Sequence, residues 1–306
     1  MNFRAPINIL ILALVTLLMA SVSPDRVNAQ EPITYDYIYP APEIEQDERF
    51  VYLLKLIRRS LDVTRDEYGR YTLSPALQAM SESRYLSEVK QGNVINLVWS
   101  STSRKKERQL RAIKIPVYRG LLSYRVCLVN KNRLKDVQER LSQGDLNNML
   151  VGQGIGWGDV TIYRHNNIHV QELSYGKLFE LLHAARFDLL PRGISEVFPE
   201  LAMAQAKELE IALEPSVYLY YPWPYYLFTN RTNYHLADRL ETGLLKLIES
   251  GEFHNLWEST YREYINRAQL DQRKRIELHN PLLDMASSFQ HSKFWYTPGE
   301  EAQSHD

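Results

Sequence analysis

Apolar residues recur every three or four positions between residues 235 and 250, which predicts an amphipathic helix. The residues that share its apolar face are Leu236, Leu240, Leu244, Leu247 and Ile248. Gly251 suits the left-handed position that follows a helix. Phe253, Leu256 and Trp257 come directly afterwards and are expected to extend the buried surface as an aromatic turn.

Upstream of this helix, short extended segments alternate with helical ones, which is typical of an α/β layered domain. The predicted strands cover residues 34–39, 94–99, 124–130, 168–172, 187–190 and 216–220. The predicted helices cover residues 47–61, 84–91, 134–143, 175–186 and 195–209. We expect a mature chain of this size to form two lobes.

Two segments rich in Pro and aromatic residues are predicted to cross between the lobes. The first covers residues 115–122 and leads into the strand at 124–130, and the second covers residues 220–228 and leads to the helix from 234. The segment between them carries a continuous α/β pattern. One lobe is therefore expected to be inserted into the other.

The order of these segments, with the helix that ends at Gly251, resembles that of the family 3 periplasmic solute-binding proteins over most of residues 34–265. Pro116 and Tyr118 stand where the family places Pro-Tyr-like residues at the first crossing. The resemblance implies the α/β fold of type 2 periplasmic binding proteins, in which each lobe is a mixed sheet flanked by helices and two crossing strands form the hinge. Another two-lobed α/β arrangement is the alternative.

The crossings and the resemblance together define the expected domains. Residues 30–119 and 228–280 form lobe 1, and residues 120–227 form lobe 2. Residues 281–306 are expected to be a polar C-terminal tail, with Phe294, Trp295 and Tyr296 as a docking point.

The N-terminus has the pattern of a secretory signal peptide over residues 1–29. Arg4 precedes an apolar run at residues 7–20, and small residues before Gln30 suit cleavage after Ala29. An uncleaved membrane anchor is the alternative, but the run is shorter than the roughly 20 residues that a spanning helix needs. We expect a soluble, exported protein that is periplasmic or otherwise secreted.

Composition narrows the function. Cys127 is the single cysteine and lies in an apolar strand, so it is expected to be a buried, inert thiol. A net charge of −1 argues against a nucleic-acid partner, and the short basic run at residues 104–108 is expected to be a solvated helix end. His165 and His169 lack the spacing of a metal site, and no hydrolase motif is found. We therefore expect no metal, no cofactor and a monomer.

Candidate site residues in lobe 1 follow the strand that ends near Trp99. The resemblance implies a hydroxyl-x-x-Arg motif there, matched by Ser101 and Arg104 with Thr102 between them, in which the Arg binds a solute carboxylate. Trp99 replaces the small residues of the family pattern. It would either stack on a ring-shaped solute at the cleft edge or pack in the core. Tyr118 is the candidate at the crossing.

In lobe 2, residues 152–159 form a glycine-rich run without the spacing of a dinucleotide fingerprint. The resemblance implies that backbone N–H groups near Gly154, Gly156 and Trp157 open a helix and meet an anionic end of the solute. A flexible turn in which Trp157 only packs is the alternative.

Arg192 stands where amino-acid-binding relatives usually have an Asp. We expect it to face Arg104 across the cleft and to select an anionic solute, so that a standard free amino acid is less expected. The alternative is that Arg192 pairs with Glu196 or Glu200 on the surface.

These features predict capture of a small polar solute, expected to be anionic, between two lobes that close by hinge motion. The partners would be the small-molecule solute and a membrane transporter or sensor. Two other classes stay open. A dehydratase-like enzyme on the same fold would need a proton-donating carboxyl group, for which Glu196 is the candidate, and a protein-interaction module would have a degenerate cleft.

Overall fold

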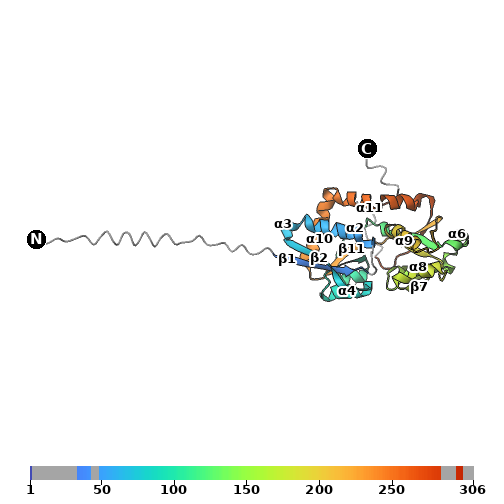
Figure 1. The fold of residues 1–306 in the computed structure, drawn as a ribbon, viewed down its shortest axis with the longest axis horizontal. Coiled ribbons are helices and arrows are strands. Elements are labelled where there is room, and N and C mark those ends of the chain that lie inside the picture. The colour runs from blue at the N-terminus through green and yellow to red at the C-terminus, as the bar shows by residue number, and fades with distance from the viewer. Residues whose placement is uncertain (2–32, 43–47, 284–293, 299–306) are drawn as a thin grey trace, which may run out of the picture. The chain divides into compact units, whose positions relative to one another are not determined.

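The alternating pattern of the sequence folds into several small sheets flanked by helices (Figure 1). The computed structural model describes Met1 and residues 33–42, 48–283 and 294–298. The described residues from Thr34 onward form one compact unit, to which all the elements below belong. The predicted signal peptide lies outside the described residues. No helix in the described part of the chain has both the length and the apolar composition of a membrane span.

The first lobe takes its elements from two separate stretches of sequence. Its three-stranded antiparallel sheet has the order β3-β11-β4, and the parallel pair β1-β2 lies beside β3. The strands are β1 (Thr34–Ala41), β2 (Arg70–Ala79), β3 (Leu97–Ser101), β4 (Leu110–Ile113) and β11 (Tyr225–Asn230). The helices are η1 (Glu48–Phe50), α2 (Val51–Asp62), α3 (Arg65–Tyr68), α4 (Glu82–Gln91), α5 (Arg104–Gln109) and α10 (Tyr234–Glu249).

The second lobe is built around β5, whose residues are all buried, as expected for a strand covered on both faces. The sheet order is β12-β10-β5-β8, with β9 also paired to β5, and a bridge from Val151 to Leu189 joins the parallel pair β6-β7 to this sheet. The strands are β5 (Tyr124–Asn130), β6 (Leu150–Gly154), β7 (His169–Leu173), β8 (Leu190–Gly193), β9 (Ile211–Leu213), β10 (Val217–Tyr220) and β12 (Lys274–Glu277). The helices are η3 (Lys131–Arg133), α6 (Leu134–Ser142), η4 (Asp145–Asn148), α7 (Asp159–His165), α8 (Tyr175–His183) and α9 (Ile194–Ala206).

The chain passes between the two sheets at the places that the sequence predicts. It leaves β4 and enters β5 through residues 114–123, which include η2 (Leu121–Ser123), and it returns from β10 to β11 through residues 221–224. A third passage was not predicted. After α11 (Glu252–Ala268) and η5 (Leu270–Gln272), β12 pairs in parallel with β10. Residues 274–277, which are expected from the sequence to belong to lobe 1, thus extend the sheet built around β5.

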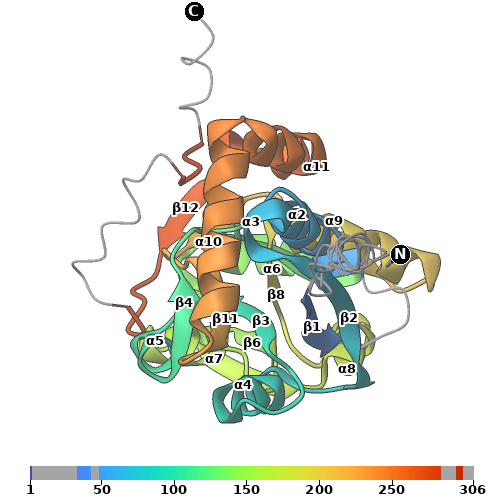
Figure 2. The same ribbon diagram turned by 90° about the vertical axis from the view of Figure 1, so that its left-hand side faces the viewer.

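The helix that the apolar pattern predicts is α10, which packs against α2 and reaches β4 and β11 (Figure 2). The side chain of Asn233 accepts a hydrogen bond from the Leu236 amide at 3.2 Å and so caps its start. Gly251 has a φ of +76°, as expected after a helix. The residues that follow are not a turn. Phe253 and Trp257 are buried on α11, which contacts both α2 and α9.

Candidate functional site

A small cavity of about 90 Å³, here called the inner compartment, lies between residues of the two lobes. Its first-lobe wall comes mainly from β1, η1, α4 and β3, and its second-lobe wall from β5, α7, β8 and α9. The lining residues are Pro40, Ala41, Arg49, Phe50, Met80, Glu82, Tyr85, Trp99, Ser101, Leu122, Arg125, Trp157, Gly158, Asp159, Arg192, Glu196, Trp223 and Tyr225.

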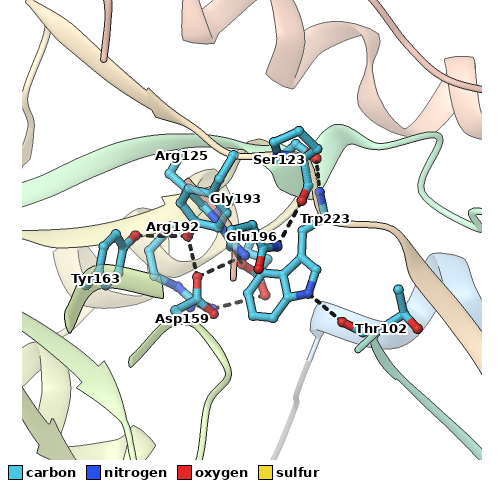
Figure 3. A network of polar contacts seen from close by, with 12 residues as sticks. Thr102, Ser123, Arg125, Asp159, Tyr163, Arg192, Gly193, Glu196 and Trp223 are labelled. Carbon is cyan, nitrogen blue, oxygen red and sulfur yellow. Dashed lines mark hydrogen bonds and ion pairs between the residues drawn. The ribbon is translucent and has the colours of Figure 1, made fainter. Parts of the chain in front are cut away.

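The second-lobe wall is a network of ion pairs around Arg125 (Figure 3). Arg125 Nη2 lies 3.1 Å from Asp159 Oδ1, and Arg125 Nη1 lies 3.3 Å from Glu196 Oε2. Asp159 also accepts a hydrogen bond from the Tyr221 hydroxyl. The backbone makes room for this guanidinium, because Arg125 pairs with Gly193 across β5 and β8, and a Cβ at Gly193 would lie 3.2 Å from Arg125 Nη1.

Arg192 extends the network on the neighbouring strand. Its Nε and Nη2 donate to the two carboxylate oxygens of Glu200 at 2.6 and 2.7 Å, and its Nη2 lies 3.1 Å from Glu196 Oε1. Glu196 also accepts the Gly193 amide at 3.2 Å at the start of α9. Trp157 stacks on the guanidinium, with 4.5 Å between Arg192 Cζ and the ring centroid. Arg192 is therefore bound on all sides by its own chain.

The network keeps Glu196 ionised. Burial raises the pKa of this carboxyl group, but the guanidinium groups of Arg192, Arg125 and Arg49 outweigh burial and lower the pKa below its ordinary value. Glu196 is thus an anion at neutral pH. It can hold a cation or accept hydrogen bonds, but it has no proton to donate there.

The first-lobe wall is more aromatic. Trp99 and Phe50 meet with their ring centroids 5.3 Å apart, and the Tyr85 hydroxyl donates to the Trp99 carbonyl at 3.3 Å. Arg49 stacks on Tyr175 of the other lobe at 4.0 Å. This wall can cover an apolar or ring-shaped part of a solute, while the opposite wall supplies the charges.

A larger outer compartment of about 620 Å³ adjoins the inner one and shares Glu82, Trp157, Gly158 and Trp223 with it. Trp223 lies where the lobes meet. Its indole Nε1 donates to the Thr102 carbonyl at 2.8 Å, and its amide donates to Ser123 Oγ at 2.9 Å (Figure 3). Together the two compartments have the size of an ordinary small-molecule site.

The structure brings together only part of the site expected from the sequence. The expected site residues that line the inner compartment are Trp99, Ser101, Trp157, Arg192 and Glu196. The expected site residues that line the outer compartment are Thr102, Gly156 and again Trp157. Trp99 is 2 % exposed, so it belongs to the core as much as to the cleft. The remaining three expected residues line neither compartment.

Each of these three has a structural place instead. Arg104 begins α5 on the surface, and its Nη2 donates to the Pro281 carbonyl at 3.4 Å. Tyr118 is buried among Tyr52, Tyr225 and Tyr261. Gly154 is covered by the ring of Trp157, which a Cβ at this position would approach to 2.2 Å.

The expected anionic solute loses its structural basis. Arg192 does not face Arg104 as an unpaired cation, because Glu196 and Glu200 neutralise it, as the alternative from the sequence proposed, although in the interior rather than on the surface. The start of α7, which follows the glycine run, already has a carboxylate of the chain beside it. Asp159 is the first residue of α7, where the helix dipole favours a carboxylate.

Sequence reasoning missed Arg125, Asp159, Arg49 and Phe50. One signal for Arg125 was available, since a lone charged residue in an apolar strand requires a buried partner. The identity of that partner depends on where the start of α7 lies in the fold, which local pattern does not reveal. Within the described ranges, no three His, Cys, Asp or Glu side chains are grouped to hold a metal ion. Cys127 is buried, and burial raises the pKa of its thiol, so it is inert.

No protein-family model and no curated sequence matches the chain. Solved structures do match it. The Streptococcus pneumoniae amino-acid ABC transporter substrate-binding protein bound to L-arginine is 14 % identical with a TM-score of 0.55, over 75 % of this chain and 94 % of its own. A Salmonella typhimurium periplasmic binding protein with high arginine specificity is 15 % identical with a TM-score of 0.54, over 74 % and 99 %.

The chain has the two-lobed fold of the periplasmic binding proteins. The fold expected from the sequence is thereby confirmed. An ancestral amino-acid-binding protein, a precursor of cyclohexadienyl dehydratase, also shares it, at 11 % identity, a TM-score of 0.52 and coverage of 74 % and 95 %. The inner compartment lies between the lobes, where this fold leaves a cleft.

Proposed function

We propose that the protein captures a small polar solute of zero net charge, such as a zwitterion of the amino-acid class, between its two lobes. The observation that carries this proposal is the balance of charge around the inner compartment. The lining carries three guanidinium groups, of Arg49, Arg125 and Arg192, and three carboxylates, of Glu82, Asp159 and Glu196. Lys106 beside Glu82 and Glu200 beside Arg192 add one charge of each sign and leave the balance unchanged. No covalent step is involved.

The balance of charge favours a solute of zero net charge, because a solute loses its hydration when the cleft buries it. A closed cleft that already contains equal numbers of cations and anions has no excess charge to compensate a charged solute, so burial of a net charge there would be costly. A zwitterion can place each of its ends beside an opposite charge.

Compartment size supports a solute with two parts. The inner compartment, at about 90 Å³, has room for a charged head group, while the outer one, at about 620 Å³, has room for a side chain. The aromatic rings of Trp157 and Trp223 stand between them and would contact the solute at the junction. Variation in the side chain would thus be tolerated more than variation in the head group.

The ionised state of Glu196 weighs against the dehydratase-like alternative. That chemistry needs a protonated carboxyl group in the cleft, and the low pKa of Glu196 leaves this group deprotonated at neutral pH. A binding role needs no such proton. We further propose that the protein acts after export and signal-peptide removal, and that it delivers its solute to a membrane transporter or reports it to a sensor.

Native mass spectrometry of freshly purified protein, followed by calorimetry with the twenty amino acids, tests this proposal. We expect a discrete adduct or a saturable heat with a zwitterion. Arg49→Ala should weaken binding at least tenfold, because truncation of one partner of a buried charge contact costs about 2 kcal/mol or more. Arg58→Ala, on the exposed face of α2, is the matched control and should bind as wild type does.

Two outcomes would contradict the proposal. Absence of any adduct and of any heat would favour an interaction module with a degenerate cleft. Binding of dicarboxylates or phosphates with no binding of zwitterions would restore the anionic solute.

A further inference from the structure

The C-terminal residues 294–298 dock where the chain crosses between the lobes. Trp295 and Tyr296 are 7 % and 5 % exposed, which is the burial of core residues. These two side chains are buried in a segment that is expected from the sequence to be a polar tail. The capture of a solute, as proposed above, assigns no role to this segment.

Trp295 lies flat on the first crossing, over Gly120. A Cβ at Gly120 would come within 2.3 Å of the indole ring, so only glycine leaves space for Trp295. Gly120 also has a φ of +75°, which other residues rarely adopt. The side chain of Trp295 hydrogen-bonds that of Tyr220 as well, at the end of β10 where the second crossing begins.

Tyr296 adds backbone hydrogen bonds to the same place. Its amide donates to the Arg119 carbonyl at 2.7 Å, and its carbonyl accepts the Tyr124 hydroxyl at 3.2 Å. Its ring packs against Trp257, with 5.4 Å between centroids. Trp257 in turn donates from Nε1 to the Tyr118 carbonyl at 3.1 Å.

These contacts join parts of the molecule that a hinge motion would displace. Arg119 and Gly120 belong to the first crossing, Tyr220 borders the second, and Trp257 lies on α11, which contacts helices of both lobes. Hinge motion requires changes of φ and ψ within such crossings. Trp295 is fixed on both crossings and Tyr296 on the first, so these changes would expose two buried aromatic side chains.

We propose that residues 294–298 form a strap that holds the two crossings together and limits how far the lobes open. The strap acts on the chain itself and does not depend on which solute the cleft takes. It makes residues 294–298 part of the hinge.

Distance measurements between spin labels test the strap in the full chain without solute. Ser87→Cys on α4 and Thr161→Cys on α7 place exposed labels on opposite walls of the outer compartment, while Cys127 is fully buried and stays unlabelled. We expect one narrow distance distribution for the otherwise unchanged chain. Trp295→Ala should broaden it toward longer distances, and Thr297→Ala, which keeps both aromatic side chains, should not.

Tyr124→Phe gives a second, milder variant, because it removes only the hydroxyl that binds the Tyr296 carbonyl and keeps the ring. It should broaden the distribution less than Trp295→Ala does, and it decides the question if Trp295→Ala does not fold, as judged by circular dichroism. Distributions identical to wild type in every folded variant would overturn the strap. Because no solute is added, this result is independent of the solute-binding test.

Discussion

Buried charges in this chain are satisfied in two different ways. Arg239 is fully buried on α10, and its guanidinium donates to the carbonyls of Leu61 and Gly69 at 3.0 and 2.9 Å, near the ends of α2 and α3. There the partial negative charge of two helix ends compensates the cation. Arg192 is compensated instead by the full charges of Glu196 and Glu200. Only the second arrangement depends on pH.

We predict that Glu196→Gln lowers the free energy of unfolding by about 2 kcal/mol at neutral pH. The change removes a buried anion that two guanidinium groups contact, while Glu200 still pairs with Arg192. Urea denaturation measures the loss. Glu210→Gln, which breaks an exposed pair with Lys131, is the control and should cost less than about 1 kcal/mol.

The difference in the free energy of unfolding between wild type and Glu196→Gln should be smaller at acidic pH. The pKa of Glu196 is lowered in the folded chain, so its contribution to stability is complete above the unfolded value of about 4.3 and is lost as the pH falls through the folded pKa. The gap between wild type and Glu196→Gln should therefore narrow below about pH 4. A gap that stays constant down to about pH 3 would mean that Glu196 is not charged in the fold.

Single residues of the site were harder to predict than their surroundings. Arg192 follows a predictable strand and Glu196 begins a predictable helix, so the sequence could place both at the cleft, whereas Trp157 was placed there only by the resemblance to the family. It misplaced Arg104, whose spacing matched a family motif but whose side chain starts a surface helix. Motif spacing sets neither the direction of a side chain nor its partner.

At the level of elements, apolar periodicity decided which predictions were confirmed. The helices α2, α4, α6, α8, α9 and α10 and the strand β5 appear close to their expected bounds, since each buries a regular set of apolar residues. The strands β2 and β12 were missed because both are mostly exposed and carry polar or charged residues. The strand β6 was hidden by its glycines, and β8 begins three residues later than expected.

Helix packing supplies a second prediction, at Gly243 on α10. A Cβ there would lie 2.2 Å from the Ser60 carbonyl oxygen on α2, so Gly243→Ala forces the two helices apart. Such overpacking costs about 3 kcal/mol, which exceeds the gain of about 1 kcal/mol in helix propensity. We expect a net loss of about 2 kcal/mol in thermal or urea unfolding.

A glycine in open space provides the matched comparison. At Gly176 on α8, a Cβ would have no heavy atom of another part of the chain within 4 Å, so Gly176→Ala should be neutral or stabilising by up to about 1 kcal/mol. If Gly243→Ala and Gly176→Ala changed the free energy of unfolding equally, the close approach of α10 to α2 at Gly243 would not limit the size of the side chain there.

For the whole molecule, the two early crossings were predictable and the third was not. Pro and aromatic residues mark residues 115–122 and 220–228 in the sequence, whereas nothing in the charged segment Lys274–Glu277 indicates that it joins the sheet of the other lobe. Its partner β10 lies far away along the chain. Pairing over such a separation is a property of topology rather than of local pattern.

We predict that the lobes close on a bound solute and that the strap remains docked as they do. Small-angle scattering should give a smaller radius of gyration with a saturating amount of the solute identified by mass spectrometry. An unchanged radius would indicate a protein that is already closed. Hydrogen exchange at the Tyr296 amide should stay slow in both states, because its bond to the Arg119 carbonyl lies within the hinge.

The late pairing of β12 with β10 also bears on how the protein is made. Residues 217–220 leave the ribosome well before residues 274–277, so one edge of the central sheet of the second lobe stays unpaired until the segment that forms β12 has been made. A nascent chain cannot finish this lobe early, since the last strand that it needs has not yet been synthesised. For the export proposed above, this order of events would keep the second lobe unfinished for longer.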